Sequence, residues 1–349
     1  MALNVASGEV KSWTPGIQVA AGATVGNILD AFRQQISLGY NSPEISFRRL
    51  GESFVLGWCA AIKSENFGEI EDTLYGVYPP IFDELIPKNA NTSRISDVSP
   101  LIIGNGWYKN YYHWTFQAIG CLLIYKRYRD DSNILLAMPR LNGWRNEVLS
   151  LTGFNGRLLE MDYHDVLHVD DCITSNLTGG GFAHLPHPAV IAEFEALAQH
   201  VTIERRFSRK LYVSRLDAGD VRRVVNEKAV CALLESRGFE IITPSELSVK
   251  EQVVAFRDAE VIVAPHGAGL ANLVYCQPGV KTRVIELFQA SCINACYARV
   301  CQAKGLDYTA IINPDRPGQD ADGTLKEIKT RNDMWQIVDL ALLERVLAA

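Results

Sequence analysis

The chain has 349 residues, of which 48% are hydrophobic and 21% are charged, and its formal net charge is -6. This length suffices for one large or two ordinary globular domains. The acidic balance excludes a surface built throughout to bind nucleic acid, and no stretch reaches the roughly 20 apolar residues of a membrane-spanning helix. The amino terminus lacks the basic start and apolar run of a secretory signal, so we expect a cytoplasmic protein.

The first half of the chain combines an irregular start with a regular continuation. Residues 1–95 contain short β-like runs and Pro-rich turns, which predict a small sheet. From residue 99 strand-like and helix-like runs alternate, with helices expected near 145–152 and over 188–200. A polar, basic stretch at 204–210 follows and is typical of a linker.

The second half repeats strand and helix regularly from about Lys210 onward. Strands are expected at RKLYVSR, IITP, VIVAP, TRVIELF and DYTAIIN, with helices between them that include AGLANLVYC. A last apolar helix is expected near 333–347. This alternation predicts a parallel, doubly wound α/β domain, and the chain as a whole is interpreted as two Rossmann-like domains.

The eight cysteines predict reduced, buried thiols. None belongs to a CxxC pair, and most lie inside apolar runs. Cys292 and Cys296 would share one helix face, but with Cys301 they offer no second ligand pair, so a helix core is favoured over a metal site.

The segment VIVAPHGAGLAN at 261–272 carries the sharpest signal. A buried strand runs through His266, Gly267 and Gly269 into a helix. The glycines let the backbone approach a ligand closely, while the free amides and dipole of the helix favour a phosphate. The alternative is a tight turn in which His266 is only a satisfied polar residue.

Charged residues follow two further strands of this domain. Glu286 ends the strand TRVIEL, where an acidic residue in a nucleotide-binding fold often contacts ribose hydroxyls. Arg215 follows YVS, and Arg222 and Arg223 come soon after; paired guanidinium donors suit a diphosphate. Solvated side chains are the alternative in each case.

The segment GNGWYKNYYHWTFQ at 104–117 opens a helix after the strand PLIIG. It places His113 among aromatic residues, with Lys109 and Asn110 on the same turn. Aromatic rings stack on sugar faces, and a histidine near neutral pKa can take a proton from a hydroxyl. The alternative is an aromatic core stripe with a buried histidine.

The D-x-D sequence at Asp320 and Asp322 is a weaker candidate. Such a pair holds a divalent cation in metal-dependent sugar transferases, but here it lies in a Pro/Gly-rich loop without a preceding apolar strand. A solvated loop is the favoured interpretation.

Taken together, these motifs resemble those of glycosyltransferase family 61, a group of inverting sugar transferases that includes bacterial polysaccharide-synthesis proteins. The resemblance spans roughly 100–290 and rests on four segments: NYYHW at 110–114, YVSR followed by RRVVNE, the EQ at 251–252, and APHGAGLAN at 264–272 followed by VIEL.

The resemblance implies a GT-B fold, in which two Rossmann-like domains face a cleft. It implies an acceptor-side domain over 1–207, with an irregular β-containing part (1–95) and a Rossmann-like part (96–207). A nucleotide-sugar-binding domain would cover 208–330, and a final helix at 331–349 would pack back across the cleft. The residues that would surround the donor are Arg215, Arg222, Asn226, His266, Gly267, Gly269, Asn272 and Glu286.

The implied activity is metal-independent, inverting transfer of a hexose or pentose. A nucleotide sugar would be the co-substrate without a resident cofactor, and a glycan or another hydroxyl compound would be the acceptor. Surface polysaccharide synthesis is the implied role. Peripheral membrane association and the oligomeric state stay open, and no nucleic-acid partner is expected.

One position departs from the family pattern. An acidic residue often follows the HW of the first cluster, whereas this chain has Gln117 in that turn. We therefore expect His113 to deprotonate the acceptor hydroxyl, with Arg215 and His266 as the other catalytic groups.

The sequence leaves two alternative functions. Gly267, Gly269 and Glu286 imitate the fingerprint of an NAD-dependent oxidoreductase, but Asn272 stands where a third glycine belongs. A non-catalytic sugar-nucleotide-binding assembly subunit would keep the fold, and Gln117 is its main support.

Overall fold

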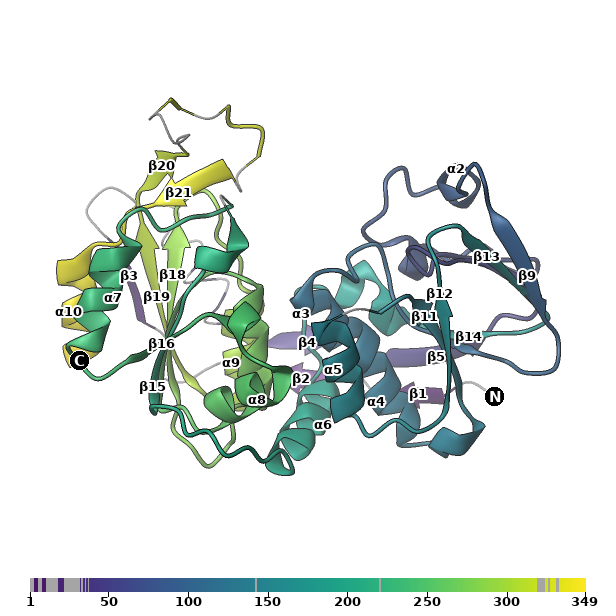
Figure 1. Ribbon diagram of the computed structural model, residues 1–349, viewed down its shortest axis with the longest axis horizontal. Coiled ribbons are helices and arrows are strands. Elements are labelled where there is room, and N and C mark those ends of the chain that lie inside the picture. The colour runs from purple at the N-terminus through teal and green to yellow at the C-terminus, as the bar shows by residue number, and fades with distance from the viewer. Residues whose placement is uncertain are drawn as a thin grey trace. The chain divides into compact units, whose positions relative to one another are not determined.

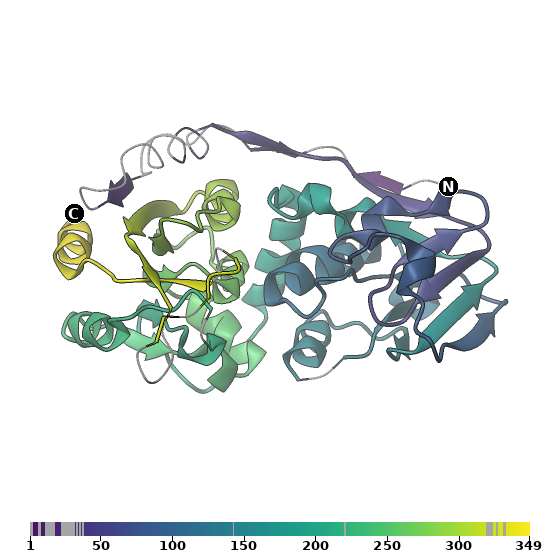
Figure 2. The same ribbon diagram turned by 90° about the horizontal axis from the view of Figure 1, so that it is seen from above.

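The computed structural model describes residues 3–5, 8–10, 18–21, 32, 34, 36, 38–141, 143–219, 221–318, 324–325, 327–330 and 333–349. The chain divides into two compact units. The first unit consists of residues 1–9 and 41–197, and the second of residues 10–40 and 198–349. Both combine sheets with helices (Figures 1 and 2), so the predicted mixed α/β class is confirmed. The predicted division after residue 207 stays a prediction.

The first unit is built on two sheets. The strands of the larger are β1 (Leu3–Val5), β5 (Ile45–Arg49), β14 (Ile173–Ser175), β10 (Leu101–Ile102), β11 (Leu135–Pro139) and β12 (Arg157–Met161), in this spatial order. Those of the smaller are β8 (Gly68–Glu69), β7 (Ile62–Ser64), β6 (Ser53–Leu56), β13 (Asp165–Val169) and β9 (Asn91–Ile95). The predicted β content of the first 95 residues is thus confirmed.

The helical elements of the first unit follow its strands in short segments. They are η1 (Glu71–Leu74), α2 (Phe82–Leu85), α3 (Tyr111–His113), the π-helix η2 (Trp114–Ile119), α4 (Gly120–Lys126), η3 (Asp131–Asn133), α5 (Trp144–Leu151), η4 (Asn176–Thr178), η5 (Gly180–Phe182) and α6 (Pro188–Gln199), the last running into the second unit. The helices predicted near 145–152 and 188–200 are confirmed by α5 and α6.

The core of the first unit lies between its two sheets. Strands β10, β11, β12 and β14 pair in parallel, as expected for an α/β layer. Ile102 of β10 and Ala137 of β11 are buried against Val55 of β6 and Leu167 of β13 from the smaller sheet. The active end of a parallel layer is its carboxyl edge, and here β10 leads directly into the segment with His113.

The second unit is a doubly wound layer with one six-stranded sheet. Its strands, in spatial order, are β16 (Glu240–Ile242), β15 (Lys210–Val213), β17 (Val261–Pro265), β18 (Arg283–Gln289), β19 (Asp307–Asn313) and β3 (Gln18–Ala21). All five pairings are parallel. Its other elements are η6 (Leu216–Ala218), α7 (Glu227–Glu235), η7 (Pro244–Glu246), α8 (Val249–Arg257), η8 (Ala268–Tyr275), α9 (Cys296–Lys304), β20 (Asp315–Pro317), β21 (Met334–Gln336) and α10 (Leu340–Ala348).

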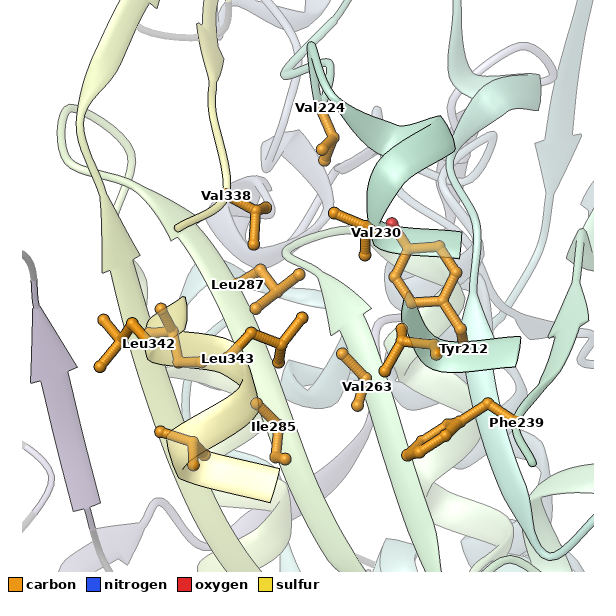
Figure 3. Close-up of a cluster of buried hydrophobic side chains, with 13 residues drawn as sticks. Tyr212, Val224, Val230, Phe239, Val263, Ile285, Leu287, Val338, Leu342 and Leu343 are labelled. Carbon is orange, nitrogen blue, oxygen red and sulfur yellow. The ribbon is translucent and has the colours of Figure 1, made fainter. Parts of the chain in front are cut away.

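Helices cover both faces of this sheet: α7 and α10 lie on one face, and α8 and α9 on the other (Figure 1). Figure 3 shows the core beneath α7 and α10. There Val263, Ile285 and Leu287 point from the strands toward Val230 of α7 and Leu343 of α10. Burial of these apolar side chains is the main source of stability for such a layer.

The chain's end differs in part from the predicted helix at 333–347. Residues Met334–Gln336 form β21, which pairs antiparallel with β20. Helix α10 begins only at Leu340, because the Asp339 side chain caps it by accepting a hydrogen bond from the Leu342 amide. Within the second unit α10 packs on the sheet; its predicted crossing of a cleft stays a prediction.

The segment AGLANLVYC, predicted to be helical, forms the 3₁₀-helix η8 over Ala268–Tyr275. Strands β2 (Gly8–Val10) and β4 (Tyr40–Ser42) lie where the chain passes between the units. Among the described residues, no helix is long and apolar enough to cross a membrane.

Candidate functional site

The turn between β17 and η8 is held by an arginine as well as by its glycines. Gly267 has φ 175°, which is extended backbone that any residue adopts. What requires glycine here is space, since a β-carbon on Gly267 would lie 1.6 Å from Nη1 of Arg215. Gly269 is tight as well, with Val213 and Pro244 each 3.3 Å from its β-carbon position. Arg215 therefore lies directly on the turn that the sequence singled out.

Arg215 and Arg222 form a cationic pair that makes no ion pair with a carboxylate in the described part of the chain. Burial, and then the nearby charge of Arg222, lower the pKa of Arg215 to about 10. Its guanidinium makes one long hydrogen bond, 3.4 Å from Nη2 to the carbonyl of Val221. The Nε atoms of both arginines are buried without a hydrogen-bond partner among the described residues.

The backbone at Arg222 supports a functional reading of this pair. Its φ is +53°, in the left-handed region that residues with a β-carbon rarely adopt. Such strain gathers at functional sites, where the surrounding structure holds it. Two guanidinium groups next to a glycine turn, without an ion-pair partner among the described residues, are suited to an anion with several oxygens, such as a diphosphate.

His266 lies on the same turn and is bonded to a buried carboxylate. Its Nδ1 is 2.5 Å from Oε1 of Glu286, while the hydroxyl of Tyr308 donates to Oε2 of Glu286, also at 2.5 Å. Glu286 is fully buried, so in this structure neither oxygen is open to a ribose. Any effect of Glu286 on a ligand passes through His266, whose ring stacks on Phe288.

The charge state of His266 is set by its surroundings. Burial is the main cause that lowers the pKa of His266; the Glu286 carboxylate opposes it, and the charges of Arg222 and Arg215 add to the lowering. The imidazole is thus coupled to the same two arginines that flank the turn.

Sequence reasoning did not assign a role to Glu227, which holds the strand end that carries Arg215. Its Oε1 accepts hydrogen bonds from the hydroxyls of Ser214 (2.8 Å) and Tyr212 (3.1 Å) and from the Arg215 amide (3.3 Å). Glu227 is buried at the first position of α7. The pattern Y-x-S-R followed by N-E contains these residues, but nothing in its spacing shows that they meet.

Two predicted donor-binding residues hold the framework around the turn. The Asn226 side chain pairs with the Val338 backbone, its Nδ2 donating to the carbonyl (2.8 Å) and its Oδ1 accepting from the amide (2.9 Å). Asn272 is fully buried, and its Nδ2 donates to Oε1 of Gln252 (2.8 Å). Gln252 in turn donates to the carbonyls of Pro244 and Leu247. These contacts favour structural roles for both asparagines.

In the first unit, His113 and Gln117 lie one helical turn apart, on α3 and the π-helix η2. Nδ1 of His113 is 2.7 Å from Oε1 of Gln117. The amide orientation of Gln117 is fixed, because its Nε2 donates to the carbonyls of Gly179 (2.7 Å) and Leu177 (3.2 Å). An amide oxygen only accepts, so Nδ1 of His113 carries the proton and Nε2 of the neutral ring has a free lone pair.

Asn105 reinforces this orientation. Its Nδ2 donates to Oε1 of Gln117 (3.1 Å) and to the carbonyl of Thr178 (2.8 Å), while its Oδ1 accepts from the Trp107 amide. His113 therefore does not need a carboxylate at position 117 to be oriented, because the fully buried Gln117 orients it.

His113 sits among aromatic rings and is largely withdrawn from water. Tyr75 and Tyr112 meet it edge-on, and Trp107 is stacked with it at a centroid distance of 6.0 Å. Burial lowers the pKa of His113; its bond to Gln117 opposes this, and the charge of His184 adds to the lowering. A neutral imidazole with Nε2 free is the form that accepts a proton from a hydroxyl.

The candidate metal ligands give no centre in the described residues. No group of three or more His, Cys, Asp or Glu side chains is placed there to share an ion. Cys292, Cys296 and Cys301 are buried and form no disulfide. The D-x-D residues Asp320 and Asp322 lie outside the described residues.

The chain matches known proteins over the region that carries these residues. A family model described as Glycosyltransferase 61 matches residues 111–285, half of the chain. The match begins two residues before His113 and ends one residue before Glu286.

Two plant proteins are similar over a shorter stretch. The first, beta-1,2-xylosyltransferase RCN11 of Oryza sativa subsp. japonica, is 34% identical over 70 residues, which are 20% of this chain and 13% of that protein. The second, a beta-1,2-xylosyltransferase of Arabidopsis thaliana, is 34% identical over 67 residues, 19% of this chain and 12% of that protein. The matched stretch is thus a small part of either relative.

Proposed function

The chain belongs to glycosyltransferase family 61, and from this premise we propose that it transfers a sugar from a nucleotide-sugar donor to an acceptor hydroxyl with inversion at the anomeric carbon. The donor would bind the second unit, and the acceptor would bind the first unit beside His113. The names of the two relatives are the reason to include xylose among the sugars tested.

The observation that carries this proposal is the arginine pair. Arg215 and Arg222 lie at the end of β15 and in the loop before α7, without a carboxylate partner among the described side chains. Both side chains are half-buried, in surroundings where a charge is usually paired with an opposite charge. A donor diphosphate would supply the missing negative charge, and the amides of the turn before η8 would add donors.

The proposed chemical step assigns a role to each of these groups. Nε2 of His113 takes the proton from the acceptor hydroxyl as its oxygen attacks the anomeric carbon. The bond between that carbon and the diphosphate oxygen breaks, and the nucleoside diphosphate leaves with the electron pair. Arg215 and Arg222 stabilise the charge that develops on it, while His266, held by Glu286, lies on the same turn.

The proposal also covers the domain arrangement, the metal requirement and the biological role. They are the GT-B arrangement with the domain limits given above, transfer without a metal ion, and a role in surface polysaccharide synthesis in the cytoplasm or at its membrane. The family resemblance supports each of them. The oxidoreductase alternative loses its main residue, because both oxygens of Glu286 are taken by His266 and Tyr308.

The test combines donor binding with turnover. Thermal shift and calorimetry with UDP, GDP, CMP and their common sugar conjugates, UDP-xylose among them, would be run in EDTA. We expect one nucleotide class to bind, and Arg222→Ala and Arg215→Lys to weaken it at least about tenfold, or about 1.4 kcal/mol. Arg206→Ala is the matched control, because Arg206 is an exposed arginine that precedes β15 in the chain.

Each result separates the alternatives. Binding and transfer in EDTA support the whole proposal, and transfer that requires added Mn²⁺ would contradict its metal-independent part. Nucleotide binding without transfer to any acceptor would identify a binding subunit instead. Equal affinity in the Arg222→Ala and Arg206→Ala variants would remove the arginine pair from the donor site.

A further inference from the structure

Trp107 is an exposed aromatic side chain on a fixed backbone. The residue as a whole is 48% exposed. The backbone around it is closed by two hydrogen bonds: its amide donates to Oδ1 of Asn105 (2.9 Å), and its carbonyl accepts from the Asn110 amide (2.8 Å). Because the turn is already held by these bonds, a ligand that stacks on the exposed ring does not have to order the backbone around it.

One face of the indole is covered by a glycine. Gly76 has φ +86°, and a β-carbon on it would lie 2.2 Å from Cδ1 and 2.5 Å from Nε1 of Trp107. The Gly76 backbone is itself packed on Gly106, whose amide donates to the Tyr75 carbonyl (2.9 Å). The pyrrole part of the indole is thus covered from one side by backbone, and the residue keeps its exposure beyond this contact.

The exposed indole is a neighbour of the candidate base. The rings of Trp107 and His113 are 6.0 Å apart between centroids, with an angle of 26° between their planes. Other exposed aromatic residues of this unit lack that relationship: Tyr163 stacks on Trp58, and Tyr78, 93% exposed, has no ring contact in the described residues.

We propose that Trp107 is the platform of an acceptor subsite that takes a pyranose ring, so that the acceptor is a saccharide. A pyranose has a C–H face that packs on an indole at about 3.5–4.0 Å and carries hydroxyls at its edge. A ring stacked there presents a hydroxyl toward the neighbouring imidazole. A serine side chain or a simple alcohol has no such face. This proposal rests on the proposed function in one respect, that His113 accepts the proton.

The test uses binding of simple sugars, which does not depend on the donor. Saturation-transfer NMR would be recorded with the methyl β-pyranosides of xylose, glucose and galactose, with glycerol as the small alcohol. We expect transfer to the ring protons of at least one glycoside in the native protein and in Tyr78→Ala. The signal should be lost in Trp107→Ala and kept in part in Trp107→Phe, which preserves a stacking face.

Kinetics with the same glycosides, once a donor is known, give the second measurement. Trp107→Ala should raise the acceptor KM at least about tenfold while the donor Kd stays unchanged. An unchanged glycoside signal in Trp107→Ala, no signal from any glycoside in the native protein, or a weakened donor Kd would overturn the subsite. Failure of the proposed function would look different, because nucleotide binding would then be absent while the glycoside signals persisted.

Discussion

The guanidinium of Arg215 fills the space next to Gly267 that a side chain on residue 267 would need. A β-carbon on residue 267 would lie 1.6 Å from Nη1 and 2.7 Å from Cζ of Arg215. Both values are far below a normal van der Waals contact, so the glycine and the position of the guanidinium are parts of one arrangement.

This relationship predicts the effect of Gly267→Ala. The added methyl group would push the guanidinium away from the turn, and we expect affinity for the nucleoside diphosphate to fall at least about tenfold by calorimetry. Gly279→Ala is the matched control, because no atom lies within 4 Å of the β-carbon position at Gly279. Equal affinities in the two variants would show that the guanidinium position does not matter to the ligand.

Proton uptake on donor binding is a second prediction. Burial together with the charges of Arg222 and Arg215 lowers the pKa of His266 in the free protein. A bound diphosphate would offset the two arginine charges and raise that pKa, so protons are taken up and affinity strengthens as pH falls, at most about tenfold per pH unit. The nucleotide sugar is the ligand to use, because its doubly esterified diphosphate does not itself titrate near neutral pH.

Calorimetry in two buffers with different ionisation enthalpies measures this uptake directly. His266→Gln should bind the nucleotide sugar without uptake. Glu286 and Tyr297 also lie around the ring, so an uptake of the same size in His266→Gln would assign the proton to another group.

A third prediction concerns Asn226 and the end of the chain. Asn226→Ala would leave the amide and the carbonyl of Val338 without their partners, which costs about 1–3 kcal/mol in the free energy of unfolding. Lys228→Ala is the control, since Lys228 is an exposed residue on the neighbouring α7. Urea unfolding of both variants provides the measurement, and equal midpoints would contradict the clamp between Asn226 and Val338.

The sequence predicted those features of the second unit that depend on local pattern. The run VIVAPHGAG has the apolar strand and glycines of a strand-to-helix turn, and both were found where expected. The partners of Glu286 could not be predicted, because they depend on the pairing of β18 with β17, which places His266, and with β19, which places Tyr308. Glu286 lies opposite Ala310, which brings Tyr308, two residues earlier on the same face, within hydrogen-bond distance.

The resemblance at Glu251 and Gln252 shows a different limit. Both residues belong to the family motif, yet their contacts here are structural. Glu251 closes a capping box with Ser248, and Gln252 joins η8 to the loop before α8. A family motif marks residues without giving their role, and only their contacts in the structure distinguish residues that bind a ligand from residues that stabilise the site.

His113 and Gln117 illustrate what spacing alone can give. Residues four apart on a helix lie on the same face, so their meeting was predictable. Gln117 lies where a carboxylate was expected, and its amide oxygen orients the imidazole instead. That role follows from Gly179 and Leu177, whose carbonyls fix the amide from a segment about 60 residues away.

The last prediction uses this pair to identify the base. Burial lowers the pKa of His113, so in the native enzyme Nε2 stays unprotonated until the pH falls below that lowered pKa. Gln117→Glu would place a carboxylate on Nδ1 and raise the pKa of His113, because an opposite charge favours the protonated ring. The acidic limb of the kcat/KM profile should therefore move to higher pH.

Two comparisons make this result specific. Gln117→Ala removes the acceptor without adding charge, and we expect kcat to fall about tenfold or more while the donor Kd stays unchanged. Asn133→Asp adds the same charge at an exposed position of the first unit and should leave the profile in place. Melting temperatures are needed alongside, because Gln117→Glu also removes the amide group that donates to the carbonyls of Leu177 and Gly179. A folded Gln117→Glu variant with an unshifted acidic limb would mean that a group other than His113 takes the proton.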